Sequence, residues 1–138
     1  MRIAHILAAG LITMLGVFAV GCNTDTSVIG GKYDTARSYP NITLSQPTLA
    51  DALGFQEPSV TRTANNLMRV TLPVRALSNE DLQVEYKVNW FDGAGQPILP
   101  DTSWATLRLE PRQPAYVAVT SSSPDAINYN IQFRWARP

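Results

Sequence analysis

Alternation of apolar and polar side chains with a period of two is the feature that most limits how this chain can fold. Residues 67–77 place five apolar side chains at every second position, and residues 82–90 and 127–135 do the same. Successive side chains of a β-strand point to opposite faces, so each segment predicts a strand with one buried and one solvated face. The predicted inward sets are Met68, Val70, Leu72, Val74 and Ala76, then Leu82, Val84, Tyr86, Val88 and Trp90, then Ile127, Tyr129, Ile131, Phe133 and Trp135.

Shorter β-prone runs occupy residues 41–44, 55–63, 103–109 and 115–121. Together with the three alternating segments they make about seven strands separated by turns, which favours an all-β fold, an Ig-like antiparallel β-sandwich. Thr48 and Gly54 bracket at most one short helix, near residues 48–53. Pro58 cannot donate to a strand ladder, so residues 55–63 are expected at an edge or a bulge.

The segment Ser78-Asn79-Glu80-Asp81 has turn chemistry and predicts an antiparallel hairpin between residues 67–77 and 82–90. In that hairpin Arg75 would lie opposite Glu85. The large aromatic side chains of the inward sets, Tyr86, Trp90, Tyr129, Phe133 and Trp135, are expected to form the core, because each buries about 150–250 Å².

The N-terminus has the order of a secretory signal: a basic start, an uncharged apolar stretch over residues 6–20, and a small residue before Cys22. An apolar stretch of 15 residues is shorter than the roughly 20 that a membrane-spanning helix needs. Ala19-Val20-Gly21-Cys22 resembles a bacterial lipobox. We therefore expect residues 1–21 to be a cleaved signal peptide, residues 22–39 a lipidated Cys22 with a flexible tether, and residues 40–138 the β-sandwich domain.

Composition excludes several kinds of chemistry. The chain carries 11 Lys and Arg against 11 Asp and Glu, so no basic surplus attracts nucleic acid. Its single His and single Cys both fall in residues 1–22, which leaves the mature domain without the usual general base or thiolate. The carboxylates of Glu80, Asp81, Asp92 and Asp101 lie in expected turns. We therefore expect no enzymatic activity, no cofactor and no metal.

The segment Tyr86-Lys-Val-Asn-Trp90-Phe91-Asp92-Gly-Ala-Gly95, followed by Trp104 and Leu107-Arg-Leu109-Glu-Pro111, resembles the YcfL family of small bacterial outer-membrane lipoproteins. The resemblance covers residue 65 onward together with the N-terminal layout. It implies a lipid-anchored β-sandwich that faces the periplasm from the outer membrane. The family has no established activity, and the resemblance carries over no functional residues.

Two functions from different classes remain open. The first is a non-catalytic lipoprotein that docks an envelope protein through sandwich edges or loops, with its acyl chains in the membrane. The alternative is a module that binds a small ligand or glycan through aromatic rings near the strand ends, namely Phe91, Trp104 and Tyr116. A basic strip of Arg69, Arg75, Lys87 and Arg134, directed at an acidic partner, is a further hypothesis.

Overall fold

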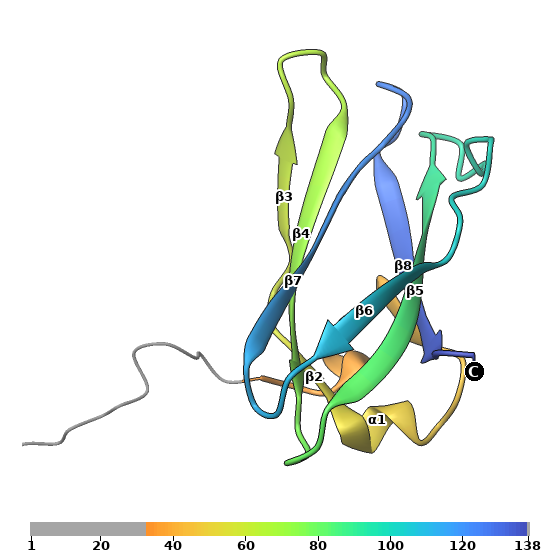
Figure 1. Ribbon diagram of the computed structural model, residues 1–138. Coiled ribbons are helices and arrows are strands. Elements are labelled where there is room, and N and C mark those ends of the chain that lie inside the picture. The colour runs from red at the N-terminus through yellow and green to blue at the C-terminus, as the bar shows by residue number, and fades with distance from the viewer. Residues whose placement is uncertain (1–32, 138) are drawn as a thin grey trace, which may run out of the picture.

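The computed structural model describes residues 33–137, and these residues form two β-sheets packed face to face (Figure 1). Sheet A contains β2, β3, β4 and β7, and sheet B has the order β1-β8-β5-β6. The prediction of an all-β sandwich is confirmed. The lipobox residues Ala19, Val20 and Gly21 and the lipidation site Cys22 lie outside the described residues.

The elements follow one another with short connections. In chain order they are a 3₁₀ turn (Ala36–Ser38), β1 (Ile42–Leu44), α1 (Leu49–Ala52), β2 (Leu53–Phe55), β3 (Ser59–Arg62), β4 (Met68–Ala76), β5 (Leu82–Phe91), β6 (Ala105–Leu109), β7 (Pro114–Thr120) and β8 (Asn128–Trp135). The short helix near residues 48–53 is confirmed. None of the helices in the described part of the chain is long and apolar enough to cross a membrane.

The described residues contain eight strands where the sequence predicts about seven, because residues 53–55, at the junction of the predicted helix and the predicted strand 55–63, form a separate strand that a bulge divides from β3. Phe55 pairs with Val74 and Ser59 pairs with Thr71, so residues 56–58 lie opposite only two residues of β4. Pro58 sits in this extra length, and β2 and β3 form the margin of sheet A. Both features expected for a proline-containing strand, the edge position and the bulge, are therefore present.

The bulge also explains how Pro73 is accommodated in the central strand β4. The amide of Gln56 donates to the carbonyl of Pro73 at 3.2 Å, so the backbone polar groups of Pro73 face the β2–β3 side. The N–H and C=O groups of one residue in a strand point the same way, and the N–H that Pro73 lacks would have pointed at the bulge. The bonds of β4 to β7 use the alternate residues and are unaffected.

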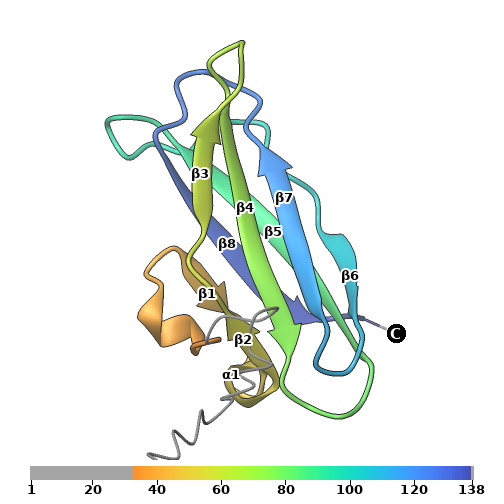
Figure 2. The ribbon, with the colours of Figure 1, turned by 90° about the vertical axis from the view of Figure 1, so that its left-hand side faces the viewer.

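The predicted hairpin between residues 67–77 and 82–90 is wrong. β4 belongs to sheet A and β5 to sheet B, so the turn at residues 78–81 carries the chain from one sheet to the other (Figure 2). Arg75 pairs with Gly54 and Pro114 rather than with Glu85. A short polar turn joins strands of one sheet or of two facing sheets equally well, and alternation alone does not separate these cases.

The core lies between the sheets and is built from the predicted alternation. All five predicted inward side chains of β4 are buried. The ring of Phe133 in β8 packs against the ring of Phe55 in β2, with 5.3 Å between the ring centroids. The structure departs from prediction just before β8 and at its last residue. Ile127 is 57% exposed, and Trp135 is half-buried, donating from its indole N–H to Thr48 Oγ1 at 2.9 Å.

The folded part starts before Pro40. Asp34 and Phe55 exchange two backbone hydrogen bonds of 2.8 Å, and Ala36 is buried against the core. Residues 33–39, which the sequence assigns to the tether, therefore lie on the sandwich beside β2.

Candidate docking surface

On the outer face of sheet B the strand cations form ion pairs with carboxylates of the same domain. Lys87 lies 3.0 Å from Asp101, the guanidinium of Arg134 lies 2.6 Å from Glu85, and Arg108 is paired with Asp81. Each cation of this face has a carboxylate of its own, either from a neighbouring strand or from an adjoining loop. A charged partner would therefore gain little binding free energy here, because each new ion pair with the partner would require breaking an existing ion pair within the domain.

The outer face of sheet A has the opposite character. Its strand residues include Arg69 and Arg75 of β4, and neither makes an ion pair within the described residues. No Asp or Glu occupies an outward position of the described strands in this sheet; those positions hold Gly54, Ser59, Thr61, Arg69, Thr71, Pro73, Arg75, Pro114, Tyr116, Ala118 and Thr120. Apart from Arg69, Arg75 and Tyr116 these residues are small and uncharged, and the Tyr116 side chain is 62% exposed.

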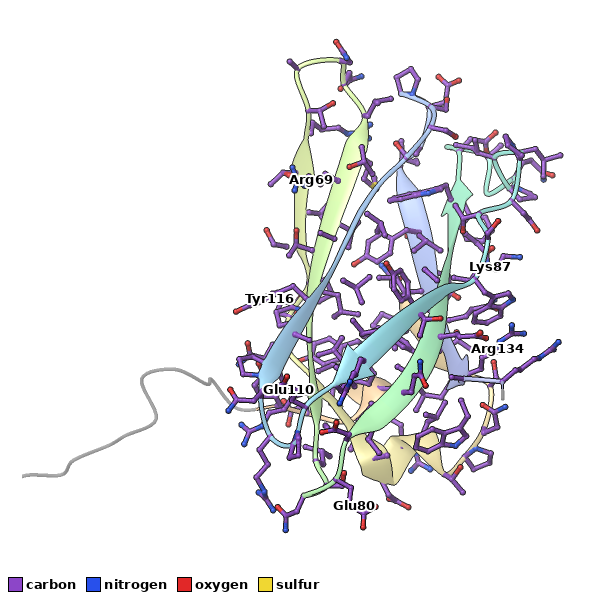
Figure 3. All side chains as sticks on the ribbon, in the orientation of Figure 1. Arg69, Glu80, Lys87, Glu110, Tyr116 and Arg134 are labelled. Carbon is purple, nitrogen blue, oxygen red and sulfur yellow. The ribbon has the colours of Figure 1, made fainter. Side chains whose placement is uncertain are left out.

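Figure 3 separates the two faces clearly: Arg69 and Tyr116 lie on one side of the sandwich, and Lys87 and Arg134 lie on the other. The predicted basic strip of Arg69, Arg75, Lys87 and Arg134 is therefore wrong. It fails for the same reason as the hairpin, because β4 and β5 belong to different sheets. Only Arg69 and Arg75 remain as a shared basic surface.

Tyr33 extends this face at the β2 margin. The guanidinium carbon of Arg75 lies 5.4 Å from the centre of the Tyr33 ring, and the Nε atom of Arg75 is buried and has no hydrogen-bond partner in the described part of the chain. Burial raises the pKa of the Tyr33 hydroxyl, Tyr116 nearby raises it further, and Arg75 opposes both. Tyr33, Arg75 and Tyr116 thus form one cluster, in which the arginine contacts an aromatic ring and has no carboxylate partner among residues 33–137.

The close approach of Tyr33 depends on Gly54, which supplies a testable prediction. A Cβ atom at position 54 would lie 2.9 Å from both the Cβ of Tyr33 and the Cδ2 of Leu77. We expect Gly54→Ala to lower the free energy of unfolding by about 1–3 kcal/mol, as overpacking usually does. Urea denaturation measures this. Gly93→Ala is the matched control, since its Cβ would meet only Ile127 at 3.6 Å; equal losses for both variants would contradict the packing of Tyr33 on Gly54.

The three aromatic residues expected as ligand contacts are placed far apart. Tyr116 lies on the outer face of sheet A. Trp104 lies against the outer face of sheet B, with the guanidinium carbon of Arg134 at 3.9 Å from its ring centre. Phe91 pairs with Asn128 at the end of β5, about 20 Å along the sheet from Glu85, the partner of Arg134. The structure does not bring the three rings together into one stacking platform.

The carboxylates singled out from the sequence do not converge on one site, and Glu80 is exposed in the turn at residues 78–81. Asp92 accepts from the amides of Ala94 and Gln96, both at 2.9 Å, and closes the turn in which Gly95 has a φ of 76°. Asp81 and Asp101 belong to the ion pairs of sheet B. In residues 33–137 no three His, Cys, Asp or Glu side chains are grouped so as to hold a metal ion.

Sequence reasoning missed Tyr33 and Gly54 as parts of this surface. Tyr33 lies in a small-residue segment without periodicity, and no local signal indicates that it folds back. Gly54 follows the expected helix and was therefore interpreted as its end rather than as a place where another segment packs closely. Tyr116 was identified from the sequence as an aromatic residue near a strand end.

Comparisons with known proteins agree with the fold. A crystal structure of Campylobacter jejuni cj0090 superposes with a TM-score of 0.60 at 16% identity, covering 70% of this chain and 98% of that one. A DUF1425 family member from Shewanella sp. pv-4 superposes with a TM-score of 0.56 at 22% identity, covering 62% of this chain and 80% of that one. No curated protein matches the sequence significantly. The family model described as "Protein of unknown function (DUF1425)" matches residues 41–135, more than half of the 138 residues, and the chain therefore belongs to the DUF1425 family.

Proposed function

We propose that this chain is a non-catalytic, lipid-anchored envelope protein whose sheet A docks an acidic protein partner. The observation that carries the proposal is the contrast between the two outer faces. All three strand cations of sheet B, Lys87, Arg108 and Arg134, are paired with carboxylates, whereas Arg69 and Arg75 of sheet A have none in the described residues.

Surface charge left unpaired on one face favours a partner of opposite charge, because complementary potentials steer association and fix orientation. The neighbouring Tyr116 supplies a large and rigid contact of the kind enriched at interfaces. Small side chains such as Ala118 and Thr71 between the two arginines leave the backbone of the sheet close to the surface. A partner segment is therefore able to lie flat on it.

The anchor is the second part of the proposal and rests on the N-terminal sequence and on the resemblance to YcfL lipoproteins. Cleavage before Cys22 and its acylation would tie the domain to the periplasmic face of the outer membrane, since several acyl chains hold more stably than one. Tyr33 follows Cys22 by 11 residues. Sheet A's outer face, which Tyr33 borders, would then be presented within about 20 Å of the lipid headgroups.

A photo-crosslinking residue at position 116 of the full chain, in intact cells, tests the docking. We expect a reproducible adduct that mass spectrometry identifies as a protein with an acidic contact segment. Arg69→Glu with Arg75→Glu should lower the adduct yield about tenfold, because the attraction becomes repulsion.

The matched control is Lys87→Glu with Arg108→Glu, which makes the same change in net charge on the other sheet. This control should leave the adduct yield unchanged. No reproducible adduct at position 116, or equal losses for the two double variants, would refute docking through sheet A. Incorporation of labelled palmitate into wild type but not into Cys22→Ala tests the anchor separately.

A further inference from the structure

We propose that β7 is a strand-addition site: an extended, acidic segment of the partner joins sheet A as a new edge strand beside β7. This inference deepens the proposed docking function and rests on it. It states how the partner binds, through main-chain hydrogen bonds to one edge, and which residue pattern the bound segment must have.

The first observation is that the free side of β7 has unpaired backbone groups. Within residues 33–137 β7 pairs only with β4, and the amide of Ser121 donates to the carbonyl of Met68 at 2.8 Å. Bonding alternates along an antiparallel pair, so residues 117 and 119 also point toward β4, and Tyr116, Ala118 and Thr120 point away. The structure gives these three backbones no hydrogen-bond partner among the described residues.

The second observation is that β7 lacks the protection usual at an edge. Exposed edge strands are normally short, charged, bulged or interrupted by proline. β1 has three residues, β3 has four with Arg62 and follows the bulge, and β6 has five with Arg108. β7 has seven residues, none of them charged, and its one proline is the first of them, so it is the longest and least protected margin in the described residues (Figure 2).

The third observation is a hollow beside that edge, between the two sheets. It has a volume of about 190 Å³ and is lined by Val88 and Trp90 of β5, by Ser103, and by Val119 and Thr120 of β7, among others. A cavity of about 150 Å³ accommodates benzene, so this hollow has room for an aliphatic side chain. Side chains of an added strand alternate between the two faces, and its inward residues would enter here.

Charge decides which occupant fits. Arg75 pairs in register with Pro114 at the start of β7, and Arg69 pairs with Thr120 at its end. An added strand would lie about 10 Å from β4, a gap that an extended arginine and a glutamate span together across the small side chains of β7. A second copy of this chain paired through its own β7 would bring no carboxylate to these arginines, because β7 has no charged residue, and its own two arginines would add like charge to the joined sheet.

These observations define the length and the residue pattern of the partner segment. It is an extended stretch of about seven residues, matching the length of β7, with carboxylates on its outer face near both ends and an apolar side chain between them on its inner face. Tyr116 would lie beside its outer face and supply the aromatic contact.

Ala118→Pro tests this mechanism with the crosslinker at position 116 in the full chain. The N–H of residue 118 faces the free edge, so proline there leaves the β4–β7 bonds intact while blocking an added strand. We expect Ala118→Pro to lower the adduct yield at least tenfold and Ala118→Thr, which keeps the N–H, to retain it. Val119→Phe fills the hollow from a half-buried position and should lower the yield as well, which keeps the test decisive if the proline variant does not fold.

Amide hydrogen exchange on the purified adduct reports the backbone pairing directly. We expect exchange at Ala118 and Thr120 to slow at least tenfold on binding, and exchange at Val117 and Val119, already bonded to β4, to stay unchanged. An adduct that persists in both Ala118→Pro and Val119→Phe, or unchanged exchange at the free edge, would overturn strand addition and leave docking intact. A self-adduct would overturn the choice of occupant, and no adduct in wild type would overturn the proposed function itself.

Discussion

Phe133→Ala is expected to lower the free energy of unfolding by about 3–5 kcal/mol, which is a large fraction of the 5–15 kcal/mol typical of a domain. Phe133 is fully buried in β8, and its ring contacts come from both sheets. Its centroid lies 5.3 Å from that of Phe55 in sheet A and 6.3 Å from that of Tyr86 in sheet B. Removing the ring leaves a cavity where the sheets meet, and chemical denaturation followed by circular dichroism measures the loss.

The matched control is Tyr116→Ala, which removes an aromatic ring that is 62% exposed on the outer face of sheet A. We expect that variant to unfold within about 0.5 kcal/mol of wild type. A loss of less than 1 kcal/mol for Phe133→Ala would mean that the two sheets do not pack through this residue, and the sandwich described above would be wrong.

Arg134→Ala is expected to cost about 2–3 kcal/mol of stability. The Arg134 Nε donates to Glu85 at 2.6 Å, and both side chains are only 17% exposed. The same guanidinium stacks on Trp104, with 3.9 Å from its carbon to the ring centre. The variant therefore leaves the Glu85 carboxylate partly buried without its cation and removes a cation–π contact.

Arg108→Ala is the matched control, because Arg108 is also a sheet B arginine paired with a carboxylate. That pair is well exposed, with the side chains of Arg108 and Asp81 at 72% and 47% exposure, and its removal should change the free energy of unfolding very little. A double-mutant cycle of Arg134→Ala with Glu85→Gln measures the coupling energy. Equal effects for Arg134→Ala and Arg108→Ala would contradict the partial burial of the Glu85 pair.

The fold was largely predictable because alternation reports directly on burial. The inward side chains of β4 are all buried as predicted, and the central residues of β8 are too. What alternation does not report is which strands pair. Nothing local distinguishes a turn within a sheet from one between sheets, so the turn at residues 78–81 was misinterpreted, and the grouping of Arg75 with Lys87 failed with it.

The docking surface was harder to predict because it depends on pairing and on long-range contacts. Tyr116 was identified as exposed, but its neighbours Tyr33 and Arg75 come from other segments of the chain. The three predicted aromatic contacts, Phe91, Trp104 and Tyr116, all lie near strand ends in the sequence, but they lie at different places on the domain. Whether Arg134 can contact an acidic partner also depends on the strand register, which places Glu85 opposite it.

The bulge around Pro58 would limit the stoichiometry of the proposed assembly. At this margin of sheet A the ladder is interrupted, and beside it Phe55 is already bonded to Asp34. A sheet that accepts a strand at only one of its two margins terminates after a single addition, because head-to-tail growth needs two complementary surfaces. Under the proposed strand addition the domain would therefore bind one segment at β7, and complexes formed through sheet A should contain one bound segment for each domain.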